Sequence, residues 1–317
     1  MKNRILVLFF LLMASGAMAQ QKALYSQYMT NYFILNPAVA GFEKDVSLKA
    51  GYRNQWVGFD GAPKTFYLSG EGALFNRNLK RSRRAQPFHG AGGMVYTDQT
   101  GPTTRTGALA SYAYHVPLNR SLFLSSGFFA GFQQFRFDPN KVYLADGSNE
   151  RDPVTNQGRI DAFMPDLTVG VFLHSEEFYV GASLFQVLGN KIHDADGAEE
   201  SSRLSRHLFV SGGYNFDVHD KIRLMPSALL KYVQGAPIQA DFNLKGAYHM
   251  SKRRQKTVYD DQVWAGVSYR TQDAIVGLVG VQFKEQFQLS YTYDITVSPL
   301  RHQSAGSHEI VLGYRIK

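Results

Sequence analysis

From residue 46 onward, the feature that most constrains the fold is alternation of apolar and polar side chains with a period of two. Val46, Leu48, Ala50 and Tyr52 would face one side of a strand, and Ser47, Lys49, Gly51 and Arg53 the other. The same pattern recurs in residues 238–250, 287–296 and 309–317. Alternating segments of about ten residues, separated by turn residues, are typical of a transmembrane β-barrel, whose strands show one face to lipid and the other to the lumen.

Counting such segments predicts an all-β fold, a transmembrane antiparallel β-barrel of about fourteen strands that covers residues 44–317. The strands are expected at about residues 45–54, 65–74, 89–98, 104–116, 121–137, 164–174, 177–187, 204–216, 222–234, 239–250, 262–270, 273–283, 287–296 and 308–317. An even number of strands would place both chain ends on the periplasmic side of an outer membrane. A soluble two-sheet β-sandwich would also show alternating strands, but usually with fewer aromatic residues.

The lengths of the connections favour the barrel over the sandwich, because bacterial barrels have short periplasmic turns and long external loops. Residues 175–176 and 284–286 are short connections on one predicted side of the membrane. The two longest gaps, residues 138–163 and 188–203, both fall on the opposite side. A sandwich would not require this asymmetry.

The N-terminal residues have the three parts of a secretory signal peptide. Lys2 and Arg4 give a basic start, residues 5–13 form an apolar run, and Ala17-Met18-Ala19 forms a small-residue cleavage site. We therefore expect residues 1–19 to be a signal peptide and the mature chain to begin at Gln20. The alternative is a membrane anchor, but the apolar run is shorter than the roughly 20 residues that a spanning helix needs.

The composition is that of a membrane protein without spanning helices. Beyond residue 19 there is no uninterrupted apolar run of about 18 residues. The chain has 18 Tyr, 23 Phe and 29 Gly, and only 19% of its residues are charged. Aromatic residues and glycine at these levels suit a barrel with aromatic girdles. No cysteine is present, which excludes disulfides and thiolate metal sites.

The charge is basic, at +8 for the whole chain and +6 once Lys2 and Arg4 are removed. An exported protein rarely meets nucleic acid, and no nucleic-acid motif is present, so an anionic membrane surface or an acidic protein is the expected counterpart. Two predicted periplasmic turns carry runs of positive charge: Lys80, Arg81, Arg83 and Arg84, and Lys252, Arg253, Arg254 and Lys256. They would dock an acidic periplasmic partner or interact with anionic lipid headgroups.

The polar residues predict neither an enzyme nor a cofactor or metal site. Nine histidines are scattered singly, and neither G-x-S-x-G nor H-E-x-x-H occurs. Residues 194–200 place carboxylates near a glycine but lack the spacing of a calcium loop, so a solvated acidic loop is expected. Charges of both signs are predicted to face the lumen: Lys49, Arg53, Glu71, Asp241, Lys245, Arg270, Glu309 and Arg315. Charges of both signs favour pairing inside the lumen, and hence a plugged or narrow barrel over a selective ion pore.

The segment before the first strand carries the most distinctive motifs. It contains Leu24-Tyr25-Ser26-Gln27-Tyr28-Met29 and then Leu35-Asn36-Pro37-Ala38-Val39-Ala40-Gly41. Residues 52–59 (YRNQWVGF), 61–65 (GAPKT), 266–270 (GVSYR), 291–294 (YTYD) and 306–310 (GSHEI) follow farther along the chain. With these motifs, almost the whole mature chain resembles the PorP/SprF family of membrane proteins associated with the type IX secretion system of Bacteroidetes.

The resemblance implies an integral outer-membrane barrel that works with type IX secretion or gliding machinery and helps cargo proteins reach the cell surface or stay on it. Its partners would be outer-membrane lipid, secretion components and surface cargo. Partner binding is expected at the family motif residues Ser26, Gln27, Tyr28, Asn36, Pro37, Ala38, Gly41, Arg53, Gln55, Trp56, Gly58 and Pro63. Independently of the resemblance, Asn36-Pro37 starts a turn and Gly41 ends it, so residues 20–43 are expected to form a plug or a periplasmic cap. The barrel pattern alone equally allows a passive channel or a hydrophobic-solute transporter.

Overall fold

The computed structural model describes residues 25–74, 85–142, 159–193, 202–250 and 261–316. Within these residues, fourteen antiparallel strands form one closed barrel, in which the short strand β11 continues β10 beside β12. The strands are β1 Val46–Asn54, β2 Lys64–Leu74, β3 Phe88–Thr100, β4 Thr103–Pro117, β5 Phe123–Phe137, β6 Ile160–His174, β7 Phe178–Phe185, β10 His207–Tyr214, β11 Phe216–His219, β12 Ile222–Val233, β13 Gln239–His249, β14 Gln262–Arg270, β15 Ala274–Phe283, β16 Phe287–Thr296 and β17 Ser307–Ile316. The predicted fold class is therefore confirmed.

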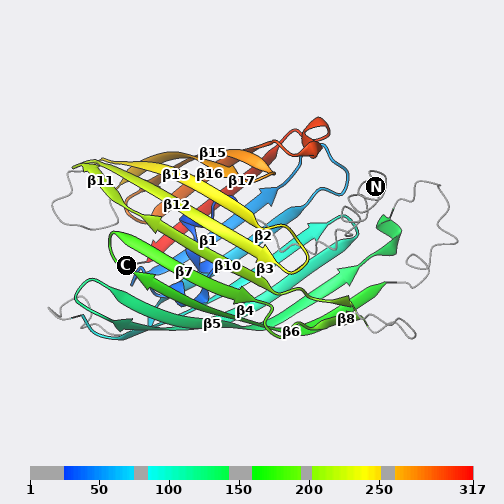
Figure 1. The fold of residues 1–317 in the computed structure, drawn as a ribbon, viewed down its shortest axis with the longest axis horizontal. Coiled ribbons are helices and arrows are strands. Elements are labelled where there is room, and N and C mark those ends of the chain that lie inside the picture. The colour runs from blue at the N-terminus through cyan, green and yellow to red at the C-terminus, as the bar shows by residue number, and fades with distance from the viewer. Residues whose placement is uncertain (1–24, 75–84, 143–158, 194–201, 251–260, 317) are drawn as a thin grey trace, which may run out of the picture.

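The barrel closes where the first strand meets the last (Figure 1). β1 pairs with β17 along its whole length, from Val46 opposite Ile316 to Asn54 opposite His308. We call the end at which β1 begins and β17 ends the base, and the opposite end the rim. The short turns after β4, β6, β11 and β15 lie at the base, and the long connections after β5 and β7 lie at the rim.

Side-chain burial shows which face of each strand is inside. In β1, Ser47, Lys49 and Arg53 are buried, whereas Leu48 and Tyr52 are exposed. The apolar face thus forms the outer surface and the polar face lines the lumen, as a membrane barrel requires. Among the described residues, no helix is long and apolar enough to cross a membrane.

Some strand boundaries differ from the predicted ones for local reasons. β5 begins at Phe123, two residues late, because Asn119 Oδ1 accepts hydrogen bonds from the backbone of Ser121 and Leu122 at 2.9 and 2.8 Å and holds them in a turn. β7 ends at Phe185 because Gln186 has a φ of 56°, which a strand does not tolerate. The sequence also gave no sign of the small hairpin of β8 Lys191–His193 and β9 Ser202–Arg203.

The described segment before β1 lies inside the lumen (Figure 1). Residues 25–43 fold into three single turns of 3-10 helix, η1 Tyr28–Thr30, η2 Tyr32–Ile34 and η3 Pro37–Val39. Asn36 caps η3, since its side-chain oxygen accepts from the Ala38 backbone N–H at 3.0 Å. We call residues 25–43 the plug. The remaining short turns are η4 Pro139–Lys141 and η5 Pro299–His302.

The plug supplies much of the apolar core. Phe33 packs edge-on against Phe129 of β5 with ring centroids 5.0 Å apart, and Tyr25 packs likewise against Tyr67 of β2 at 5.3 Å. Side chains that would otherwise line a water-filled lumen are buried against the plug. The core of this barrel therefore lies between the plug and the wall.

Candidate functional site

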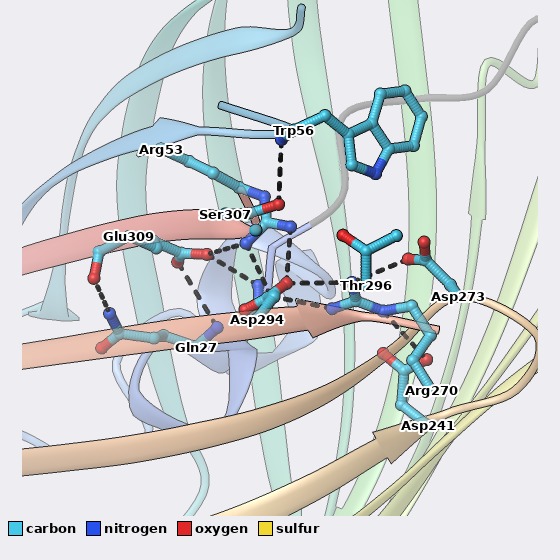
Figure 2. Close-up of polar contacts among 12 residues, drawn as sticks. Gln27, Arg53, Trp56, Asp241, Arg270, Asp273, Asp294, Thr296, Ser307 and Glu309 are labelled. Carbon is cyan, nitrogen blue, oxygen red and sulfur yellow. Dashed lines mark hydrogen bonds and ion pairs between the residues drawn. The ribbon is translucent and has the colours of Figure 1, made fainter. Parts of the chain in front are cut away.

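The first turn of the plug is tied to the wall by a buried cluster of charges, which we call the latch: Ser26, Arg53, Arg270, Asp294 and Glu309. Figure 2 shows Arg53 and Arg270 on either side of Asp294. Arg53 contacts Asp294 at 2.8 Å and Glu309 at 3.2 Å, and Arg270 contacts Asp294 at 3.3 Å. All four charged side chains are at most 2% exposed. Buried charges are tolerated only when they are paired in this way.

Ser26 joins the plug to these charges through its hydroxyl. The hydroxyl accepts from Arg53 at 2.6 Å and Arg270 at 2.8 Å, and it donates to Asp294 at 2.7 Å. A hydroxyl has one donor and two acceptor positions, so all three are used. The Ser26 backbone N–H also donates to Glu309 at 2.7 Å. A single plug residue thus contacts both arginines and both carboxylates of the latch.

Neighbouring motif residues extend the attachment. The Gln27 side-chain amide donates to the Glu309 backbone carbonyl at 2.8 Å. Asn243 of β13 donates to the Tyr28 hydroxyl, and Asn31 donates to Ser69 of β2 at 3.0 Å. Asp241 extends the cluster from β13, with its carboxylate 3.5 Å from Arg270 and 2.7 Å from Lys231. The plug is therefore bound to strands on opposite sides of the β1–β17 seam.

The second half of the plug is attached nearer the base, to β2 again and to β4 and β6. Asn36 donates to the Val171 carbonyl at 2.9 Å, and Gly41 N–H donates to Glu71 at 2.6 Å. His115 Nε2 lies 2.8 Å from the Ala40 carbonyl, and its Nδ1 lies 2.6 Å from Ser125 Oγ. A neutral imidazole that donates from Nε2 and accepts at Nδ1 satisfies both contacts. His115 thus holds the plug backbone against β4 and β5.

Where the plug leaves the lumen, Glu43 pairs with Arg315 at 2.8 Å. Burial opposes ionisation of Glu43, but the positive charges of Lys49 and Arg315 outweigh it and hold the pKa of Glu43 below its ordinary value. The carboxylate therefore stays charged and keeps the pair intact.

Three wall glycines leave room for the plug, two of them for its backbone and Gly170 for the Asn36 side chain. A Cβ added at Gly90 would lie 1.8 Å from the Ala40 carbonyl oxygen, and one at Gly170 would lie 2.1 Å from Asn36 Oδ1. A Cβ added at Gly127 would lie 2.8 Å from Ala38 Cα. These strands accept glycine, despite its cost in a sheet, because the plug approaches them closely.

We expect Gly127→Ala to destabilise the barrel by about 1–3 kcal/mol, because the new methyl group overlaps the backbone of η3 and the plug must shift. Gly277→Ala in β15 is the matched control, since a Cβ added there meets no atom within 4 Å. The measurement is the temperature at which the folded band disappears in detergent gel electrophoresis. Equal midpoints for the two variants would contradict the close approach of plug and wall.

The remaining motif residues lie in the rim loop between β1 and β2. Gln55 N–H bonds to the Pro63 carbonyl at 2.9 Å and closes this loop. Trp56 N–H donates to Ser307 Oγ at 3.0 Å, as Figure 2 shows. Trp56 and Gly58 have positive φ values of 48° and 95°. The loop therefore lies against the start of β17, and its conformation explains the glycine at position 58.

The structure brings together only part of the predicted site. Ser26 and Arg53 belong to the latch and Gln27 contacts it. The Asn36–Gly41 motif contacts other strands, and the Gln55–Pro63 motif forms the rim loop. The two basic turns and the acidic loop 194–200 lie outside the described residues. Sequence reasoning missed His115 as a plug contact. The only signal in the sequence was a polar residue near the end of the strand expected at residues 104–116.

The latch binds a segment of its own chain through charged hydrogen bonds and ion pairs. In the part of the chain that the structure covers, no group of three or more His, Cys, Asp or Glu residues could hold a metal ion. Apolar residues outside, paired charges inside and an internal N-terminal segment define the class as an integral membrane β-barrel with a plugged lumen.

The chain belongs to the PorP/SprF family of type IX secretion system membrane proteins, whose pattern matches residues 17–314. The match includes the plug, the latch and nearly all of the barrel, and it confirms the resemblance seen in the motifs. No curated protein matches the chain in sequence.

Solved structures with a similar fold are membrane barrels. The TodX deltaS2S3 mutant, a monoaromatic hydrocarbon channel, is similar over 89% of this chain and 93% of that chain, with 11% identity and a TM-score of 0.51. The Ralstonia pickettii toluene transporter TbuX is similar over 95% and 96%, with 12% identity and a TM-score of 0.48. At this identity the likeness to TodX concerns the fold alone.

Proposed function

We propose that this protein is a non-enzymatic outer-membrane component of the type IX secretion or gliding machinery that supports export or surface attachment of cargo proteins. The family match is the observation that carries the proposal. The plug supports it physically, since a lumen filled by a segment that is bound to buried charges of the wall does not leave an open path for solutes. We further propose that the base, with both basic turns, faces the periplasm and the rim faces the outside.

The motif residues divide into two roles in this proposal. Ser26, Gln27 and Arg53 are buried, so in the closed arrangement they act by holding the plug. The rim loop is accessible, and Phe59 beside Gly58 is 43% exposed. We infer that cargo contacts the rim loop, while the basic turns Lys80–Arg84 and Lys252–Lys256 bind periplasmic partners.

We expect deletion of the gene to remove one or a few large proteins from the cell surface while uptake of small solutes stays normal. The measurement compares surface proteomes and solute uptake in deletion cells and in cells complemented with the wild type or with the Gly277→Ala control. Complementation by both should restore the surface proteins. A normal surface proteome together with impaired uptake would refute the secretion role.

The second candidate is a passive channel or hydrophobic-solute transporter. A cavity of about 630 Å³ below the plug favours it, since this volume would hold a small molecule. The plug is the obstacle, because a solute could pass only if the latch opened. Impaired uptake in the experiment above would therefore support this candidate.

A further inference from the structure

The cavity below the plug combines an apolar wall with an excess of positive charge. Its apolar surface includes Phe42 of the plug, Phe172, Tyr179, Met225 and Trp264. The charged residues that line it are five cations and two carboxylates: Lys44, Arg120, Arg223, Lys245 and Arg315, and Glu43 and Glu176. Such a lining is complementary to a ligand that carries carboxylates next to aromatic or aliphatic groups.

The cations differ in how far they are already neutralised. Arg315 pairs with Glu43 at 2.8 Å, and Arg223 pairs with Asp217 at 2.7 Å. Lys245, in contrast, forms no ion pair with the described residues. Its ammonium lies 5.9 Å from the centre of the Trp264 ring. An incoming carboxylate would therefore meet, at Lys245, a cation beside an aromatic face that no ion pair with the described residues neutralises.

The route into the cavity indicates what kind of ligand can reach it. Near the base the neighbouring strands are joined by hydrogen-bonded ladders, including β6–β7, β7–β10, β12–β13 and β13–β14. The plug closes the cavity toward the rim, and Arg120 and Glu176 of the base turns line its mouth. Access is therefore along the barrel axis from the aqueous phase at the base. A water-soluble ligand fits this route better than a lipid from the bilayer.

We propose that this cavity is a docking site for an acidic peptide segment with aromatic or aliphatic side chains, belonging to a water-soluble protein on the base side. The segment places a carboxylate on Lys245 and an apolar side chain against Trp264 and Phe42. The proposal concerns the chemistry of the cavity and holds whether or not the barrel serves type IX secretion.

Tryptophan fluorescence tests the proposal, because the chain has only two tryptophans and Trp56 is in the rim loop. In the Trp56→Phe variant, held in nanodiscs of zwitterionic lipid, Trp264 is the sole reporter. The probe is a short, capped peptide of alternating Glu and Phe. We expect a saturable change in emission, and binding at least about tenfold weaker for the matched Gln–Phe peptide, which lacks the charge.

Lysine variants in the same background locate the contact. We expect Lys245→Met to weaken binding about tenfold and Lys245→Arg to preserve it, because only the first removes the charge. Lys141→Met, in η4 at the rim, is the matched control and should leave binding unchanged. A heat-shifted gel band verifies that each variant is folded.

Two results would overturn the proposal. One is equal binding in either comparison: the Glu–Phe peptide against the Gln–Phe peptide, or the protein with Lys245 intact against the Lys245→Met variant. The other is saturation of the Trp264 signal by dodecanoate with no response to the peptide, which would assign the cavity to a lipid-like anion.

Discussion

Arg53→Met is expected to destabilise the folded barrel by about 3–5 kcal/mol, the usual cost of removing one partner from a buried ion pair. Arg53 contacts Glu309, Asp294 and the Ser26 hydroxyl. Asp294 keeps Arg270 as a counter-ion, but Glu309 loses the only ion pair that it forms among the described residues. A buried carboxylate is then left without a compensating charge. The measurement is unfolding by urea in detergent, followed by the heat-modifiable gel band.

A double variant distinguishes loss of charge balance from loss of packing. Glu309→Gln removes the uncompensated carboxylate, so the pair Arg53→Met with Glu309→Gln should recover much of the stability that Arg53→Met loses. Arg53→Lys is the conservative comparison. Its stability should lie between those of the wild type and Arg53→Met, since one ammonium cannot reproduce two guanidinium contacts. If the single-variant effects simply add in the double variant, the two side chains are not coupled and the latch is incorrectly described.

Deletion of residues 25–41 is expected to convert a closed barrel into a conducting one. The deletion removes all of the plug except Phe42 and Glu43 and leaves β1 in place, so the strand ladder from Val46 onward is retained. A barrel of fourteen strands lies between small barrels that side chains fill and porins that leave an aqueous channel, and single-channel conductance should rise at least about tenfold above the closed baseline. The measurement is ion current across planar bilayers.

The control for this deletion is the full-length Gly277→Ala variant, which should remain closed. Arg53→Met should give an intermediate result, with brief openings, because it weakens the attachment of the plug without removing it. A deletion variant that folds, as shown by its gel shift, but does not conduct would mean that wall side chains alone close the lumen.

The sequence by itself determined the strands and the side of the wall on which each residue lies. Alternation is a local property with a period of two, so Lys49, Arg53 and Glu309 could be assigned to the lumen without knowledge of their partners. The difference in length between base turns and rim loops likewise followed from the sequence alone. Errors at strand ends, as at Phe123, arose where a single side chain such as Asn119 captured backbone donors.

Tertiary structure decided which inward-facing groups meet. Arg53 and Asp294 are 241 positions apart, and they come together only because β1 pairs with β17. The sequence allowed residues 20–43 to be either a plug or a periplasmic cap, and the structure places residues 25–43 within the lumen. The glycines at positions 90, 127 and 170 became interpretable only with the plug beside them. Local patterns specify the face of a strand, but contacts across the lumen depend on closure of the whole barrel around the plug.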